Sequence, residues 1–193
     1  MKLNEVAATK SGLVLNRKKA SLQSNIKRNY SVVSLKSFNP NGIYDYNESE
    51  IFIAEEELKE DYIARKGDVL VRLREPINAI YIDENYEDLI ISSLMAVIRV
   101  DENKVSPQYL TYYINSDIAQ KQLLQDVTQT AVKMVKISDI QNLDINIPSI
   151  EKQKLIVETM NTFNKEEVLL NKLIAEKQNL KKLIFNTTIE GIK

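Results

Sequence analysis

Basic side chains with polar or aromatic neighbours are the residues in this sequence whose types and spacing suit a chemical task. The first group lies within the first 36 residues and consists of Arg17, Lys18, Lys19, Lys27, Arg28 and Tyr30. Ammonium charges, forked guanidinium donors and an aromatic ring together suit the phosphates and bases of nucleic acids. We interpret the group as a polyanion-binding surface. The alternative is that these charges do no more than solvate a surface and pair with acidic neighbours.

Two further groups have the side chains that read base edges. Arg72 and Arg74 are two positions apart in an expected strand, so both side chains should project from one face. A guanidinium can donate two hydrogen bonds to one guanine. Gln129, Thr130 and Lys133 bring amide, hydroxyl and ammonium groups to one expected loop. These five residues complete the candidate nucleic-acid-binding set.

Catalytic and metal-binding groups are scarce. The sequence has no Cys and no His, which excludes disulfides, Cys-based zinc sites, thiol nucleophiles and imidazole acid–base catalysis. Only four glycines occur, and none has the spacing of a nucleotide-binding loop. The consecutive acids Glu55, Glu56 and Glu57 cannot converge on one metal ion, so we expect them to be solvated. The sequence therefore predicts a protein that is not an enzyme, with no cofactor and no metal site.

The charge is strongly patterned although the formal net charge is only −1. Residues 1–36 contain eight Lys or Arg and one Glu, whereas residues 37–64 contain one Lys and eight Asp or Glu. A basic face can therefore exist without a basic isoelectric point. The start resembles no signal peptide, and the most apolar stretch, residues 88–99, is too short to span a bilayer. We expect a soluble cytoplasmic protein without membrane contact.

Short strand patterns dominate the first 148 residues. We expect strands within residues 31–35, 50–54, 69–73, 79–82, 89–100, 133–137 and 143–147. Ser106 and Pro107 form a helix start, which predicts a helix to Ile114, and a second short helix should cover residues 118–124. The fold class is therefore α+β, with a mixed, β-rich domain over residues 1–148 that contains short helices.

A single long helix is predicted over residues 149–190, because no Gly or Pro occurs between Pro148 and Gly191. Apolar residues repeat along it every seven positions, as in helices that pair with other helices. Lys177, Glu166, Thr159 and Thr187 interrupt the repeat, so a long regular zipper is excluded. We expect this helix to pair with a second copy as an antiparallel coiled coil through Ile156, Phe163, Leu170, Leu173, Leu180 and Ile184.

Three segments and the long helix, in this order, resemble a known family. Residues 66–72, 105–116 and 136–153 are similar to motifs of the specificity subunit of type I restriction–modification enzymes. The resemblance implies a DNA target-recognition domain followed by a spacer helix. It implies double-stranded DNA as ligand, and as partners a methyltransferase subunit that uses S-adenosylmethionine and a DNA-translocating restriction subunit with nuclease activity. The specificity subunit itself catalyses nothing.

Family members usually carry two recognition domains and two helices, whereas this chain has one of each. The resemblance therefore implies a half-length form that pairs with itself and directs its partners to a bipartite target. Two alternatives stay open: an oligomeric scaffold that binds proteins, and an inactive cassette kept for recombination into a longer specificity subunit. The basic residues favour DNA binding over the scaffold. The complete order of motifs argues against a degraded fragment.

Overall fold

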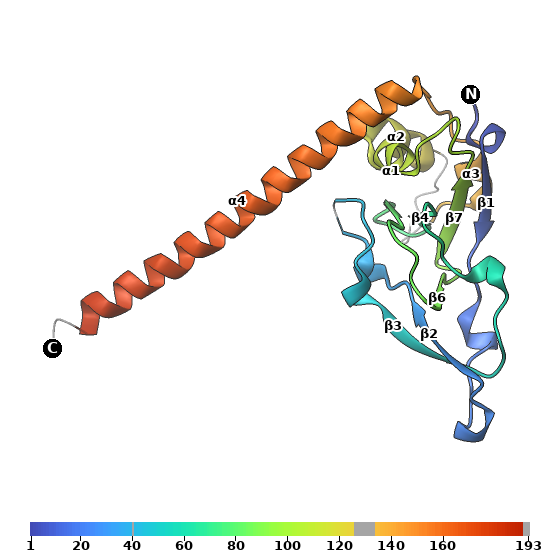
Figure 1. The fold of residues 1–193 in the computed structure, drawn as a ribbon, viewed down its shortest axis with the longest axis horizontal. Coiled ribbons are helices and arrows are strands. Elements are labelled where there is room, and N and C mark those ends of the chain that lie inside the picture. Colours follow the sequence, from blue (N-terminus) through green and yellow to red (C-terminus); the bar gives the residue numbers. More distant parts are fainter. Residues whose placement is uncertain (40, 126–133, 191–193) are drawn as a thin grey trace. The chain divides into compact units, whose positions relative to one another are not determined.

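The computed structural model describes residues 1–39, 41–125 and 134–190, and the chain divides into two compact units after Lys154 (Figure 1). The first unit contains all the strands and three short helices. The second consists of most of a long helix, α4 (Ile150–Glu190). The expectation of a mixed, β-rich domain with short helices and one long C-terminal helix is confirmed.

An antiparallel four-stranded sheet forms one half of the first unit. Its strand order is β1-β7-β4-β5, and the strands span Ala7–Ser11 (β1), Met95–Val100 (β7), Val69–Arg72 (β4) and Ala79–Tyr81 (β5). Leu70 and Val71 are both buried although they point to opposite faces of β4. The sheet is therefore covered on both sides at β4, whereas Lys10 and Ser11 of the edge strand β1 are exposed.

A three-stranded sheet with the order β3-β2-β6 forms the other half. Strand β2 (Arg28–Val32) pairs antiparallel with β3 (Glu50–Ala54) and parallel with β6 (Leu89–Ile90). Alternate residues of the β2–β3 pair face the core, among them Tyr30 and Phe52. Their neighbours on the opposite face are polar or exposed, and Ile51 is an exposed apolar residue there.

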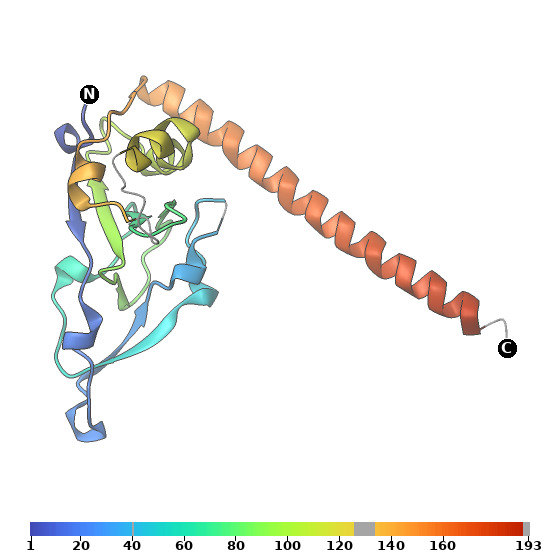
Figure 2. The same ribbon diagram turned by 180° about the vertical axis from the view of Figure 1, so that it is seen from behind.

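Of the short helices, α1 packs against β5 and β4, α3 packs against β1 at the opposite edge of the four-stranded sheet, and Figure 2 shows α1 and α2 side by side. They span Pro107–Asn115 (α1), Asp117–Leu124 (α2) and Ile137–Gln141 (α3). As expected, the Ser106 hydroxyl accepts a hydrogen bond from the Tyr109 amide, and Pro107 is the first helical residue. Single 3-10 turns occupy Leu3–Glu5, Leu15–Arg17, Gln23–Asn25, Leu35–Ser37, Tyr46–Glu48 and Glu60–Tyr62.

Helix α4 spans Ile150–Glu190, close to the predicted range of 149–190. Its first turn belongs to the first unit and is held there by the buried side chain of Gln153. The amide nitrogen of this side chain donates to the carbonyl oxygens of Lys104 and Pro148, and its oxygen accepts from the Ser106 amide. In the described part of the chain, no helix is long and apolar enough to cross a membrane.

The first residues of the chain pair with the segment that precedes α4. The Leu3 amide donates to the Leu143 carbonyl at 3.0 Å, and the Ile145 amide donates to the Met1 carbonyl at 2.8 Å. Lys2 forms an isolated antiparallel bridge with Asp144. The strand expected over residues 143–147 is therefore reduced to this short pairing.

Three other expectations about the strands were wrong. The strand expected at residues 133–137 does not form in its described part, because Ile137 begins α3 and Met134 makes only an isolated bridge. Strand β2 begins three residues earlier than the expected Ser31. Strand β1 was not expected at all, because the two consecutive polar residues Lys10 and Ser11 interrupt its weak alternation of apolar and polar residues.

Candidate nucleic-acid interface

Five of the candidate basic residues, Arg17, Lys18, Lys19, Lys27 and Arg28, gather around the end of β3; we call them the strand-end cluster. Within the sheet, Arg28 of β2 lies opposite Ala54, the last residue of β3. Lys19 forms an isolated bridge with Ala54, and the Lys27 amide donates to the Ala54 carbonyl at 2.9 Å. Two basic stretches that are separated in the sequence are thus brought together by one strand end.

Acidic side chains neutralise part of the strand-end cluster. Lys18 forms an ion pair with Glu56, whose carboxylate raises the pKa of the lysine above its ordinary value. The expectation that all of the acids at residues 55–57 are only solvated is therefore wrong for Glu56. Among the described residues, Arg17, Lys19 and Lys27 have no ion-pair partner, and all three are exposed. They are the cations most available to a polyanion.

Arg28 is held in a fixed orientation by two neighbours. Its Nε donates to one carboxylate oxygen of Asp88 at 2.9 Å, and its Nη2 lies 2.7 Å from the other. These hydrogen bonds raise the pKa of the guanidinium. The guanidinium carbon lies 5.5 Å from the centre of the Tyr30 ring, within the range of a cation–π contact. The side chain of Arg28 nevertheless remains exposed.

Tyr30 is a core residue in the structure. It is buried, and its hydroxyl accepts a hydrogen bond from the Leu58 amide at 2.9 Å. Its ring supports Arg28 and packs with the core of the smaller sheet, so it has no free face on which a base could stack.

Asp88, which sequence reasoning missed, has a positive φ of 52°. Asp tolerates this conformation better than most residues, but one Asp in an acidic loop gives no recognisable signal.

Arg72 and Arg74 lie at the end of β4, and only Arg72 belongs to the strand. The expectation of one continuous strand through both was wrong. Arg72 is half-buried, and its Nη2 donates to the Glu75 carbonyl at 3.4 Å. Arg74 is exposed and forms an isolated bridge with Met134. The other three base-reading candidates, Gln129, Thr130 and Lys133, lie outside the described residues.

One turn connects the end of β4 with the segment that leads into the strand-end cluster. The Leu73 amide donates to the Leu94 carbonyl at 3.0 Å, and the Ser93 amide donates to the Leu13 carbonyl at 2.8 Å. A groove of about 410 Å³ lies beside this turn. Residues 13–16, 32–36, Glu50 and 92–95 line it, and Lys36 supplies a positive charge. None of the candidate basic residues lines this groove, and Val32 and Glu50 in its lining form the end of the β2–β3 ladder opposite to Arg28 and Ala54.

The described side chains include no metal-binding cluster. No group of three or more Asp, Glu, His or Cys residues in residues 1–39, 41–125 and 134–190 could hold a metal ion. The unpaired basic side chains of the strand-end cluster suit the binding of an anionic ligand.

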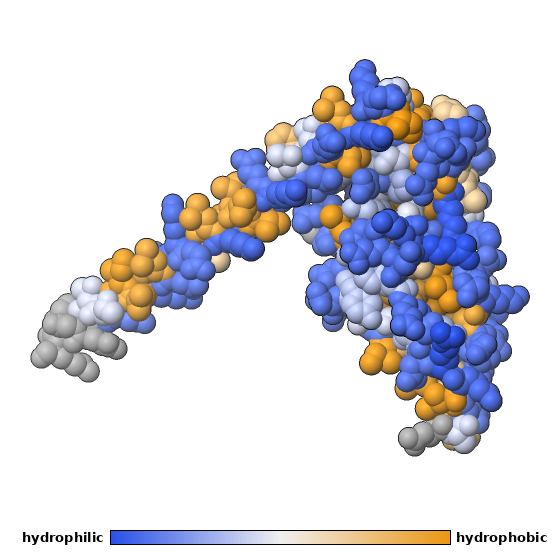
Figure 3. Space-filling model, viewed as in Figure 1, coloured by the Kyte–Doolittle hydropathy of each residue, from blue (hydrophilic) through white to orange (hydrophobic). Residues whose placement is uncertain are grey.

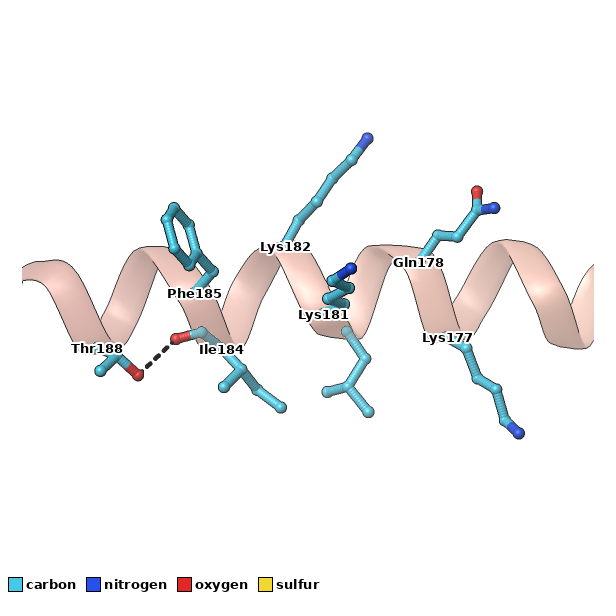
Figure 4. Close-up of a pocket in the computed structure, with 8 residues that line it drawn as sticks. Lys177, Gln178, Lys181, Lys182, Ile184, Phe185 and Thr188 are labelled. Atoms are coloured by element: carbon cyan, nitrogen blue, oxygen red, sulfur yellow. Dashed lines mark hydrogen bonds between the residues drawn. The ribbon is translucent and has the colours of Figure 1, made fainter.

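The apolar seam of α4 has no partner within the described part of the chain. Its six residues, with exposed fractions of 36% to 57%, are Ile156, Phe163, Leu170, Leu173, Leu180 and Ile184. Figure 3 shows apolar patches along this helix. In the close-up of its C-terminal part, Ile184 and Phe185 project from different sides, so apolar surface extends beyond the seam (Figure 4). Exposed apolar surface of this extent is typical of an interaction site.

Comparison with known proteins relates this arrangement to one family. The family model for the type I restriction modification DNA specificity domain matches residues 1–183. A putative type I restriction enzyme MjaX specificity subunit from Methanocaldococcus jannaschii is 28% identical over 152 residues, which are 70% of this chain and 35% of that protein. The EcoBI specificity subunit of Escherichia coli is 29% identical over 133 residues, 66% of this chain and 28% of that protein.

The fold is also similar to that of a solved HsdS subunit. The crystal structure of the HsdS subunit from Thermoanaerobacter tengcongensis superposes with a TM-score of 0.68 at 20% identity, covering 95% of this chain and 46% of that one. The chain thus spans about a third of the length of the curated relatives and under half of the solved one. Since the family match covers both the globular unit and most of α4, the chain belongs to the type I restriction modification DNA specificity domain family.

Proposed function

We propose that this chain is a non-catalytic DNA-recognition subunit of a type I restriction–modification system that acts as a homodimer of half-length subunits. Its globular unit would recognise one half of a bipartite DNA target, and α4 would pair with the α4 of a second copy. The observation that carries the proposal is the combination of one family-type globular unit with one helix whose apolar seam is unpartnered.

DNA contacts in this proposal come from the two basic groups and from residues 129–133. The exposed cations Arg17, Lys19 and Lys27 would bind phosphates, and the fixed Arg28 with Lys18 beside it would extend that surface. Arg72, Arg74, Gln129, Thr130 and Lys133 would read base edges. The backbone hydrogen bonds from Leu73 to Leu94 and from Ser93 to Leu13 link the residue between Arg72 and Arg74 to a position four residues before Arg17, which supports the action of both groups on one duplex.

The target would be an inverted repeat. Two identical globular units related by a two-fold axis must bind the same sequence in opposite orientation. A helix of 41 residues is about 60 Å long at 1.5 Å per residue. Because this length exceeds ~34 Å, which is one turn of B-DNA, base pairs that neither globular unit contacts must separate the half-sites.

The protein partners would be the methyltransferase and restriction subunits. Apolar residues outside the seam, such as Leu169, Leu183 and Phe185, are exposed and could contact the methyltransferase subunit while the seam is occupied. The purified chain should then neither methylate nor cleave DNA alone. Turnover of S-adenosylmethionine by this chain alone would contradict the assignment.

A protein-binding scaffold is the second candidate, and the pairing of Lys18 and Arg28 with acids is the observation that favours it. These pairs reduce the positive charge available to DNA. The inactive recombination cassette has no such support, because the first unit has a well-formed core and α4 is helical over 41 residues.

Selection of bound duplexes from a random pool, combined with light scattering, tests the proposal. We expect a dimer that enriches an inverted repeat with a spacer of unselected bases. The Leu170→Glu/Leu173→Glu double variant should be a monomer that binds single half-sites weakly. A monomeric unmodified protein, or an enriched sequence without two-fold symmetry, would contradict the proposal.

A further inference from the structure

Two opposite charges interrupt the apolar seam of α4. Glu166 and Lys177 occupy positions at which the seven-residue repeat requires apolar residues, and both side chains are exposed. Neither forms an ion pair with any residue that the structure describes in its own chain. A charge in the seam of paired helices is costly unless an opposite charge on the partner compensates it.

We propose that Glu166 and Lys177 of two copies pair with each other and thereby fix the register of the α4 dimer. This inference rests on the proposed self-pairing of the chain. In an antiparallel pair with its two-fold axis between Asn171 and Lys172, Glu166 of each copy faces Lys177 of the other. The symmetric interface therefore contains this ion pair twice.

The same register matches the apolar residues of the seam. Leu170 then faces Leu173 of the second copy, and Phe163 faces Leu180. The two Leu170–Leu173 contacts lie between the two ion pairs, and the two Phe163–Leu180 contacts lie outside them. Further from the axis, the interrupting threonines meet aliphatic residues: Thr159 faces Ile184, and Thr187 faces Ile156.

Registers shifted by one heptad leave the charges uncompensated. In one direction Lys177 would face Leu173 of the second copy while Glu166 would face Ile184. In the other direction Glu166 would face Leu170, and Lys177 would face Thr159. Each shift buries isolated charges against groups that cannot neutralise them. One polar residue in such a seam commonly selects a register at some cost in stability.

A parallel pair in register is disfavoured by the same two residues. In that arrangement Glu166 would face Glu166 of the second copy, and Lys177 would face Lys177. Like charges in direct contact at an interface strongly oppose association. The two residues that weaken the seam thus discriminate against both the parallel and the shifted arrangements.

The register also fixes the spacing, along the helix pair, of the two points at which the helices leave the globular units. From the axis to Leu155, the first residue of the second unit, the helix rises about 25 Å at 1.5 Å per residue. The two copies of Leu155 are therefore about 50 Å apart along the pair. A shift of one heptad would change this spacing by about 10 Å, close to three base pairs of B-DNA.

Charge reversal in the full-length chain tests the ion pair. Glu166→Lys and Lys177→Glu should each weaken dimerisation at least about tenfold, because each creates two like-charge contacts per dimer. The two single variants mixed together should form a heterodimer of nearly unmodified affinity, since every contact is again between opposite charges. Lys182→Glu and Glu158→Lys make the same charge changes away from the seam and should leave the affinity within about twofold. Sedimentation equilibrium measures each value.

Cysteine cross-linking tests the register directly, because the sequence contains no cysteine. A chain carrying Leu170→Cys mixed with one carrying Leu173→Cys should form an intermolecular disulfide, and the pair Leu170→Cys with Leu180→Cys should not. A monomeric unmodified chain would overturn the self-pairing itself. A stable dimer in which Leu170→Cys links to Leu180→Cys, or in which the mixed charge variants fail to associate, would overturn only the register.

Discussion

The buried carboxylate of Asp68 accepts two hydrogen bonds from the guanidinium of Arg99, at 2.8 Å from Nε and 3.0 Å from Nη2. This pair connects the residue before β4 to strand β7. Arg99 also donates to the Ile63 carbonyl, and the Arg65 amide donates to Asp68. The hydrogen bonds to Asp68 raise the pKa of Arg99. Gly67 adopts a φ of 88°, which places Asp68 in this position.

Removal of the Asp68 carboxylate should strongly destabilise the globular unit. Asp68→Ala leaves the half-buried Arg99 charge and the Arg65 amide without their acceptor, so we expect a loss of about 3–5 kcal/mol. Urea unfolding followed by circular dichroism measures this loss. Lys104→Ala is the control because its ion pair with Asp101 is exposed, and it should cost at most about 1 kcal/mol. Equal losses for both variants would contradict the role assigned to Asp68.

DNA binding should depend strongly on salt, through the unpaired cations of the strand-end cluster. Reversal of Lys19 or Lys27 to Glu should weaken binding to all duplexes alike and lower the salt slope by about one per lost phosphate contact. Titrations between about 50 and 200 mM salt measure the slope. Lys121→Glu, on α2, is the matched control and should leave the slope unchanged. Affinity that is independent of salt would contradict the proposed surface.

Asp88→Asn should strengthen DNA binding at low salt. The substitution removes a negative charge beside Arg28, and Asn tolerates the positive φ of this position. We expect a gain of about 1 kcal/mol, or roughly fivefold, from the removed repulsion. Arg28→Ala should act in the opposite direction. Fluorescence anisotropy with one labelled duplex can compare the DNA affinities of both variants. If both substitutions changed the affinity in the same direction, the result would be inconsistent with a DNA contact at Arg28.

Tyr30→Phe should lower stability without lowering the DNA affinity of the folded protein. The buried Leu58 amide loses its acceptor, which costs about 1–3 kcal/mol. The ring that supports Arg28 is retained. Unfolding and DNA titration of the same preparation separate the two effects. A specific loss of DNA affinity at unchanged stability would instead place the Tyr30 hydroxyl at the DNA.

Elements with strong local signals could be predicted from the sequence. Ser106 and Pro107 determine the start of α1 through hydrogen bonding and a preset φ, and β3 has the predicted bounds of residues 50–54. The continuous helical sequence after Pro148 predicted α4 equally well. In each case the pattern that predicts the element lies within or next to the element itself, although β3 forms its backbone hydrogen bonds with the separate strand β2.

Elements that depend on distant partners could not be predicted. Strand β1 forms because Ala7 to Ser11 pair with β7, almost a hundred residues later. The pairing of Lys18 with Glu56 and of Arg28 with Asp88 likewise depends on which strand ends meet. The composition of the basic group could be read from the sequence, whereas its partial neutralisation required the tertiary structure.

The pairing of Leu3 with Leu143 has a consequence for folding during translation. The globular unit cannot complete its hydrogen bonds until residue 145 has left the ribosome, so the first three residues of the chain must wait for most of the unit to be made. Synthesis of the 41 residues of α4 then takes about 2–8 s at ~5–20 residues per second. Domains of mixed structure fold in milliseconds to about a second. Each nascent chain therefore has time to finish its recognition unit before its full apolar seam can meet another chain.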